Sequence, residues 1–188
     1  YCLKPLLLAG TTGGGVVHVG DAELISWFDE VSMADCDSVG GKGASLGEMH
    51  INLKKAGVNV PNGFNVTVDA YQTFVNSKIP DSTWGNIREP EGVENIRATA
   101  ITSNTLAEAL KICLDGADPK DHLNLHGRAS LARALVRQTP VPEVVRQAII
   151  AGYSKLCDEY GQGVDVAVRS SATTEDSAEA SFAGQYES

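Results

Sequence analysis

The sequence predicts an α+β fold, because short alternating segments and longer helical repeats both occur along its 188 residues. Strands are expected at 24–28 and 164–168, and on the far side of the Pro61-Asn62-Gly63 turn, where apolar residues cluster or alternate beside turn residues. Apolar residues recur every three or four positions elsewhere, which predicts helices starting near Gly43, Thr67 or Asp69, Thr105, Leu123 and Pro142.

Two units are expected along the chain. Residues 1–22 include Thr11-Thr12-Gly13-Gly14-Gly15 and show no periodicity, which is typical of a poorly ordered tail or linker. Residues 23–188 carry the periodic segments and form the folded unit. From 78 to 103 the sequence is irregular, and we interpret Trp84 there as an anchor that packs a long loop.

Composition excludes several classes of protein. The net charge is −9, and residues 158–188 contain seven carboxylates against Arg169 alone, which argues against a nucleic-acid-binding surface. No apolar run is long enough to span a membrane. The four cysteines are widely spaced, without CxxC or paired histidines, so we expect neither a metal site nor disulfides. We therefore expect a cytoplasmic location.

The most informative stretch is the glycine-rich run 39–49, in which Gly41 and Gly43 flank Lys42. Glycines let the backbone turn tightly and approach a ligand, and a helix that starts there directs unpaired N–H groups at an anion. Lys42 would add a positive charge, so the run predicts a phosphate-binding turn. It matches neither a Walker A loop nor a dinucleotide fingerprint. The alternative is a glycine-rich loop with a solvated lysine.

The helix that follows this run is expected to bury one apolar stripe. The stripe comprises Leu46, Met49, Leu53 and Ala56. Lys54 and Lys55 would lie in the last turn, where cations suit the helix dipole, and Gly57 would end the helix.

A second cation, Arg169, follows the predicted strand 164–168 and opens a loop rich in hydroxyl groups. Ser170, Ser171 and Thr173 lie in this loop. A guanidinium beside several hydroxyl donors can bind phosphate. The alternative is a surface loop in which Arg169 pairs with Glu175 or Asp176.

Four motifs occur in an order that resembles a known family. They are the run 39–49, then Val58-x-Val60-Pro61-x-Gly63-Phe64, then Val168-Arg169-Ser170-Ser171-Ala172-Thr173-x-Glu175-Asp176, then Ala180-Ser181-Phe182-Ala183-Gly184-Gln185. Together they are similar to the N-terminal end of the phosphoenolpyruvate synthase (pyruvate, water dikinase) family, and more broadly to pyruvate phosphate dikinase and rifampicin phosphotransferase. The resemblance covers about residues 24–188 and is loose between 78 and 138. Tyr186 departs from the polar residue often found there.

The resemblance implies the N-terminal part of an ATP-grasp-type domain, with a mixed sheet and packed helices. It implies that Lys42 and Arg169 contact ATP phosphates, with Gly41, Gly43, Ser170, Ser171 and Thr173 as secondary candidates. In the family, ATP phosphorylates a histidine, and the phosphoryl group passes to pyruvate. The Mg²⁺ ligands, the phosphohistidine and the pyruvate site are expected beyond Ser188, so no catalytic residue or metal ligand is assigned to this chain.

The four histidines match none of the family's phosphohistidine context and are interpreted as surface or packing residues. They are His18, His50, His122 and His126. The resemblance allows a homodimer for the full-length enzyme, and the chain alone would be inactive. Two other interpretations stay open: the nucleotide lobe of a rifampicin-phosphotransferase-like enzyme, and a truncated, non-catalytic protein.

Overall fold

The structure is a computed structural model that describes residues 18–19, 22–173, 176–177 and 180–181. Helices and short strands are both present, so the predicted α+β class is confirmed. The expected tail falls mostly on residues outside the described ones, and so does the motif segment 182–185. Within the described part, no helix combines the length and the apolar character that crossing a membrane requires.

The strands of the described residues form three separate antiparallel pairs rather than the expected mixed sheet. The pairs are β1 (His18–Val19) with β2 (Ala22–Glu23), β3 (Ile25–Trp27) with β4 (Phe64–Val66), and β5 (Asp176–Ser177) with β6 (Ala180–Ser181). The predicted strands around 24–28 and after the Pro-Asn-Gly turn are therefore confirmed.

The predicted strand at 164–168 is wrong. This segment is irregular in the structure, and Val168 at its end is 93% exposed. An alternating sequence satisfies the side-chain pattern of a strand, but the backbone becomes one only where a neighbouring strand pairs with it. No strand among the described residues pairs with this segment.

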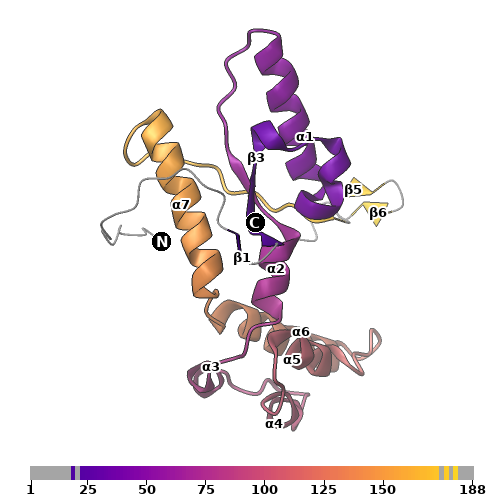
Figure 1. The fold of residues 1–188 in the computed structure, drawn as a ribbon. Coiled ribbons are helices and arrows are strands. Elements are labelled where there is room, and N and C mark those ends of the chain that lie inside the picture. Colours follow the sequence, from indigo (N-terminus) through magenta and orange to yellow (C-terminus); the bar gives the residue numbers. More distant parts are fainter. Residues whose placement is uncertain (1–17, 20–21, 174–175, 178–179, 182–188) are drawn as a thin grey trace.

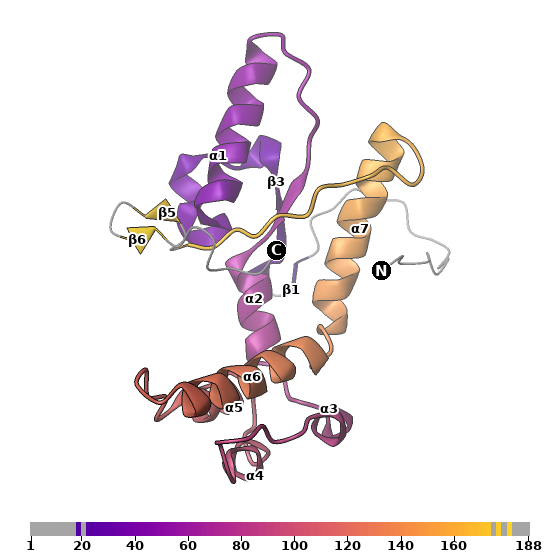
Figure 2. The same ribbon diagram turned by 180° about the vertical axis from the view of Figure 1, so that it is seen from behind.

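The β3–β4 pair separates the two long helices of the upper half of the molecule, α1 (Cys36–Lys55) and α7 (Glu143–Tyr160), as Figures 1 and 2 show. Because side chains alternate along strands, Ile25 and Phe64 share one face, and both lie against Gly152 of α7. On this side Trp27 contacts Phe64, with ring centroids 5.5 Å apart. The other face carries Asn65, which lies against Gly43 of α1.

Two single turns of 3₁₀ helix, η1 (Phe28–Glu30) and η2 (Met33–Asp35), connect β3 to α1. After β4, the Thr67 hydroxyl accepts from the Ala70 N–H and caps α2 (Val68–Val75), as predicted.

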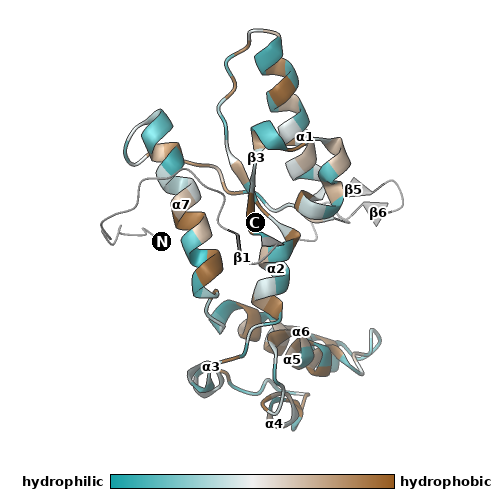
Figure 3. Cartoon of the chain, in the orientation of Figure 1, coloured by the Kyte–Doolittle hydropathy of each residue, from teal (hydrophilic) through white to brown (hydrophobic). Residues whose placement is uncertain are grey.

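The lower half of the molecule is a cluster of four helices below α2 (Figure 1). They are α3 (Asp81–Asn86), α4 (Ile96–Ala100), α5 (Leu106–Leu114) and α6 (His122–Gln138). Their shared core includes Trp84, Leu106 and Leu131, all buried, so Trp84 is a packing anchor as predicted. The irregular segment expected over 78–103 is corrected, because it contains α3, which carries Trp84, and α4. Apolar and hydrophilic residues intermingle along these helices (Figure 3), as expected for helices with one buried side.

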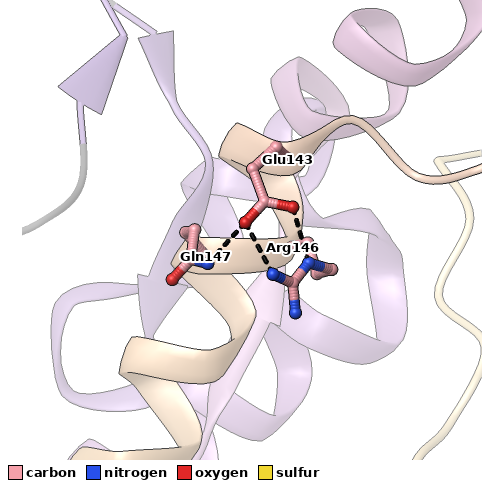
Figure 4. A network of polar contacts seen from close by, with 3 residues as sticks. All are labelled: Glu143, Arg146 and Gln147. Atoms are coloured by element: carbon pink, nitrogen blue, oxygen red, sulfur yellow. Dashed lines mark hydrogen bonds and ion pairs between the residues drawn. The ribbon is translucent and has the colours of Figure 1, made fainter. Parts of the chain in front are cut away.

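The helix α7 begins with a small polar network on its exposed surface (Figure 4). Arg146 donates two hydrogen bonds to the Glu143 carboxylate, at 2.7 and 2.6 Å, and Gln147 donates a third at 2.5 Å. These hydrogen bonds lower the pKa of Glu143 to about 2. An anion at Glu143 also suits the positive end of the α7 dipole.

Candidate functional site

The glycine-rich run lies inside α1 and interrupts it at Gly40. Gly40 has φ 76° and ψ 163°, which are not helical values, and helical geometry resumes after it. The expected turn followed by a helix from Gly43 is therefore corrected: a first helical turn already forms at Cys36, and Gly40 breaks the helix into two segments. A positive φ favours glycine because it has no Cβ. The break creates a second helix start just before Lys42.

The buried face of α1 differs from the predicted stripe. Met49 is 44% exposed and Ala56 is exposed, whereas Gly43, Gly47 and His50 are buried. We call this buried side the glycine face of α1; it comprises Val39, Gly40, Gly43, Ala44, Gly47 and His50. The interpretation of Met49 as a core residue was wrong, while His50 is a packing residue as expected.

Close backbone approach explains why this face carries glycine. A Cβ added at Gly43 would lie 2.6 Å from Asn65 Oδ1, and one added at Gly47 would lie 2.3 Å from the carbonyl oxygen of Val31. Real Cβ atoms do not come this close to a neighbour, so any larger residue must push the helix away. Gly43, which the sequence suggested for a ligand, and Gly47 therefore both serve packing.

The far end of α1 follows the sequence prediction. Gly57 adopts φ 80°, its N–H donates to the Lys54 carbonyl, and the Val58 N–H donates to Leu53. This pair of hydrogen bonds is a Schellman motif, which ends a helix at a left-handed glycine. Lys54 and Lys55 lie in the last turn as expected.

The loop after Arg169 reaches the break in α1 through Ser171. The Ser171 hydroxyl donates to the Val39 carbonyl at 2.7 Å and accepts from the Gly43 N–H at 3.1 Å. A Cβ added at Gly40 would lie 2.5 Å from Ser171 Oγ and 2.9 Å from the Ala172 carbonyl oxygen. The two predicted motifs, far apart in sequence, therefore share one contact region.

The predicted site residues differ in their environments. Gly41 and Lys42 are half-buried at the second helix start, and Gly43 is buried beside them. Arg169, Ser170 and Thr173 are exposed in the loop that Ser171 ties to α1. Neither Ser170 nor Thr173 makes a hydrogen bond to another described residue. The side chains of Glu175 and Asp176, the alternative partners of Arg169, lie outside the part of the chain described in such detail.

A hollow of about 380 Å³ lies beside the first turn of α1, which precedes the break at Gly40. It is lined by Glu23, Ser26, Glu30, Val31, Asp35, Ser38 and Val39. Its three carboxylates make it unsuitable for a polyphosphate, because like charges repel in a confined space. Neither Lys42 nor Arg169 lines this hollow.

Sequence reasoning missed Asn65. Its side chain is 9% exposed, it lies against Gly43, and its Nδ2 has no hydrogen-bond partner among the described residues. A buried amide donor without an acceptor lowers the stability of the fold, and this one lies beside the proposed phosphate-binding turn. The available signal was a polar residue at an inward position of the strand after Gly63.

Comparison with known proteins identifies the family. Residues 36–188 match the family model described as pyruvate phosphate dikinase, AMP/ATP-binding domain. The chain belongs to this family. The match includes the break in α1, Lys42, Arg169 and Ser171, and the predicted resemblance is confirmed.

Curated relatives of the chain carry the name phosphoenolpyruvate synthase. The protein from Synechocystis is 41% identical over 172 residues, covering 89% of this chain and 18% of that protein. The probable synthase from Methanocaldococcus jannaschii is 40% identical, covering 89% of this chain and 12% of its own length. The Escherichia coli synthase is 36% identical over 89% of this chain. The chain thus spans less than a fifth of the length of these three relatives.

The family implies ATP, and the residues at the break in α1 fit a phosphate group. A helix start, a half-buried lysine and an arginine loop held against that start form a suitable cradle. A metal ion is a different case. In the described part of the chain, no group of three or more histidine, cysteine or acidic side chains could hold one, so no metal ligand is assigned here.

Proposed function

We propose that this chain is the ATP-binding lobe of a phosphoenolpyruvate synthase, with Lys42 and Arg169 as its phosphate contacts. The observation that carries the proposal is the Ser171 contact, because it brings the Arg169 loop onto the helix turn that contains Lys42. The family's description as an AMP/ATP-binding domain supports ATP as the ligand. An ATP-grasp-type architecture remains part of this proposal.

The two cations would act by position and charge. Phosphoryl transfer depends on holding the phosphates in place and neutralising their charge. Lys42, near a helix N-terminus, supplies a compact ammonium, and Arg169 supplies a planar fork that can bind two phosphate oxygens at once. Mg²⁺ would share this charge neutralisation when bound, through ligands outside the described residues.

In the longer enzyme that we propose, ATP would phosphorylate a histidine, and the phosphoryl group would reach pyruvate on other domains. The names of the curated relatives favour this activity over a rifampicin-phosphotransferase-like one. A homodimer of the full-length enzyme and a cytoplasmic location belong to the same proposal. The chain alone would bind nucleotide without turning it over.

Calorimetric titration of the 188-residue chain with MgATP tests the proposal, using Lys42→Ala and Arg169→Ala. Loss of one charge-assisted phosphate contact costs about 1.5–3 kcal/mol, which corresponds to about 10- to 150-fold weaker binding. Lys55→Ala is the matched control, because Lys55 is an exposed lysine at the opposite end of the same helix. We expect it to leave the affinity unchanged.

Two outcomes would contradict the assignment. Equal affinity of Lys42→Ala and the unmodified chain would remove Lys42 from the site. Absence of binding by the unmodified chain at millimolar MgATP would favour the non-catalytic interpretation. In a full-length version, Lys42→Ala should also slow ATP-dependent phosphorylation of the enzyme, and unfolding curves of each variant would show that the fold is retained.

A further inference from the structure

The second segment of α1 starts without a side chain that could cap it. Gly40 occupies the N-cap position, since its backbone is non-helical and helical geometry follows it. A serine at this position would normally accept a hydrogen bond from the N–H two or three residues later. Glycine cannot do so. In this chain, the Ser171 hydroxyl accepts a hydrogen bond from the N–H of Gly43, the third residue after Gly40, and thereby replaces the N-cap side chain.

The absence of a side chain at Gly40 and the presence of Ser171 are two parts of one arrangement. A Cβ at Gly40 would lie 2.5 Å from the Ser171 hydroxyl and overlap it. A serine or threonine at position 40, which could cap the helix from within α1, would therefore displace Ser171. The positive φ of Gly40 disfavours any other residue in addition. The local sequence therefore leaves the helix start open for Ser171.

We propose that Ser171 is a positioning residue for the phosphate site: it caps the helix start that carries Lys42 and anchors the loop that carries Arg169. The inference rests on the proposed function of those two cations. Lys42 directly precedes the capped Gly43, and Arg169 lies two residues before Ser171. The two hydrogen bonds of Ser171 thus hold both backbones in one arrangement.

The exposure of the preceding chain makes this anchor important. Every residue from Asp165 to Ser170 is exposed, so burial contributes little to holding Arg169 in place. Ser171 provides two hydrogen bonds to α1 at the point where the chain reaches it. A guanidinium placed in advance loses less conformational freedom when it binds a phosphate.

Ser171 itself is poorly suited to bind the phosphate, although it was a secondary candidate from the sequence. A hydroxyl group has one hydrogen to donate, and Ser171 donates its hydrogen to the Val39 carbonyl. A phosphate oxygen needs a donor, so direct binding would require the Val39 bond to break. The structure therefore favours an indirect role, through the backbones of α1 and the loop.

Ser171→Ala tests the inference in the 188-residue chain, with Thr105→Ala as the matched control. Thr105 caps α5 in the same way, accepting from the Glu108 N–H at 3.2 Å, but lies in the lower helix cluster. Each change removes one capping hydroxyl. Amide hydrogen exchange by NMR should accelerate about 2- to 30-fold at Gly43 in the first variant and at Glu108 in the second, the range expected for a lost cap.

Nucleotide binding separates positioning from stability alone. Ser171→Ala should weaken MgATP binding by a similar factor of about 2 to 30, whereas Thr105→Ala should leave it unchanged. In a double-mutant cycle, Arg169→Ala should cost less affinity in the Ser171→Ala background than in the unmodified chain, because the guanidinium is no longer held in place. Additive effects, or equal losses in both capping variants, would overturn the positioning role.

The NMR measurements keep this inference distinct from the proposed function. If the unmodified chain does not bind MgATP, the proposed function fails for this chain. The positioning role of Ser171 is then tested only by the backbone measurements at Gly43 and Arg169. Faster exchange at Gly43 with lower backbone order at Arg169 in Ser171→Ala would then support it. Unchanged exchange at Gly43 and unchanged order at Arg169 would overturn it, whatever the nucleotide does.

Discussion

Replacing Gly47 with alanine tests whether the glycine face of α1 exists so that two backbones can meet. The added Cβ would lie 2.3 Å from the carbonyl oxygen of Val31 and 3.0 Å from its Cβ. The obstacle is mainly backbone, which cannot rotate away as a long side chain can. The helix and the segment around Val31 must therefore move apart.

Two opposing effects set the magnitude at Gly47. Alanine is favoured over glycine inside a helix by about 0.5–1 kcal/mol, whereas overpacking a well-filled core costs about 1–3 kcal/mol. Because the overlap involves a carbonyl oxygen, we expect the upper part of that range and a net loss of about 1–2 kcal/mol. For a chain of this length the loss corresponds to a fall in Tm of about 2–8 °C.

Gly85→Ala is the matched control, because Gly85 also lies in a helix, α3, and a Cβ added there meets nothing within 4 Å. Only the helix propensity remains, so this variant should be neutral or more stable by up to about 1 kcal/mol. Urea unfolding followed by circular dichroism would compare the two, with amide exchange within α1 as a local measure. A Gly47→Ala variant as stable as Gly85→Ala would refute the packing argument.

Two further predictions concern titrating groups. Hydrogen bonds from Arg146 and Gln147 hold the pKa of Glu143 at about 2, so an NMR titration of the side-chain carboxyls should give that midpoint, and Arg146→Gln should raise it. Since the folded pKa is below the ordinary glutamate value of 4.5, this stabilisation is complete above pH 4.5 and is lost as the pH falls through 2. A midpoint near 4.5 in the unmodified chain would contradict the network. Burial raises the pKa of the Cys113 thiol to about 11, so this thiol should resist alkylation at neutral pH until the chain unfolds. Half-buried Cys36 should react in the folded chain, and equal rates at the two cysteines would contradict the prediction.

Helices could be predicted from the sequence wherever local signals agreed. Thr105 caps α5 and Pro142 precedes α7, and in both helices the apolar positions face the core as their spacing predicts. Trp84 was identified as a packing anchor from its large aromatic side chain, although the helix α3 that carries it was not predicted. These signals act within a few residues, so the linear sequence contains them.

The buried side of α1 could not be predicted in this way. Apolar spacing favoured the side of Met49, but the helix buries Gly43, Gly47 and His50 instead. The nearest neighbours of Gly47 and Gly43 are the Val31 carbonyl and the Asn65 side chain, and their distance demands small residues rather than apolar ones. The strand predicted up to Val168 failed for a related reason, since a strand requires a partner and alternation does not provide one.

The sequence by itself determined the α+β class, the family, and Lys42 and Arg169 as candidate phosphate contacts, because these depend on residue types in local order. Only the tertiary structure decided that Ser171 caps α1 across the fold and that glycines serve close packing. Hydrogen bonds and steric overlap depend on distances between segments that the chain order does not contain. The run 39–49 is therefore a break in a helix, and the cap that completes it comes from the loop of Arg169.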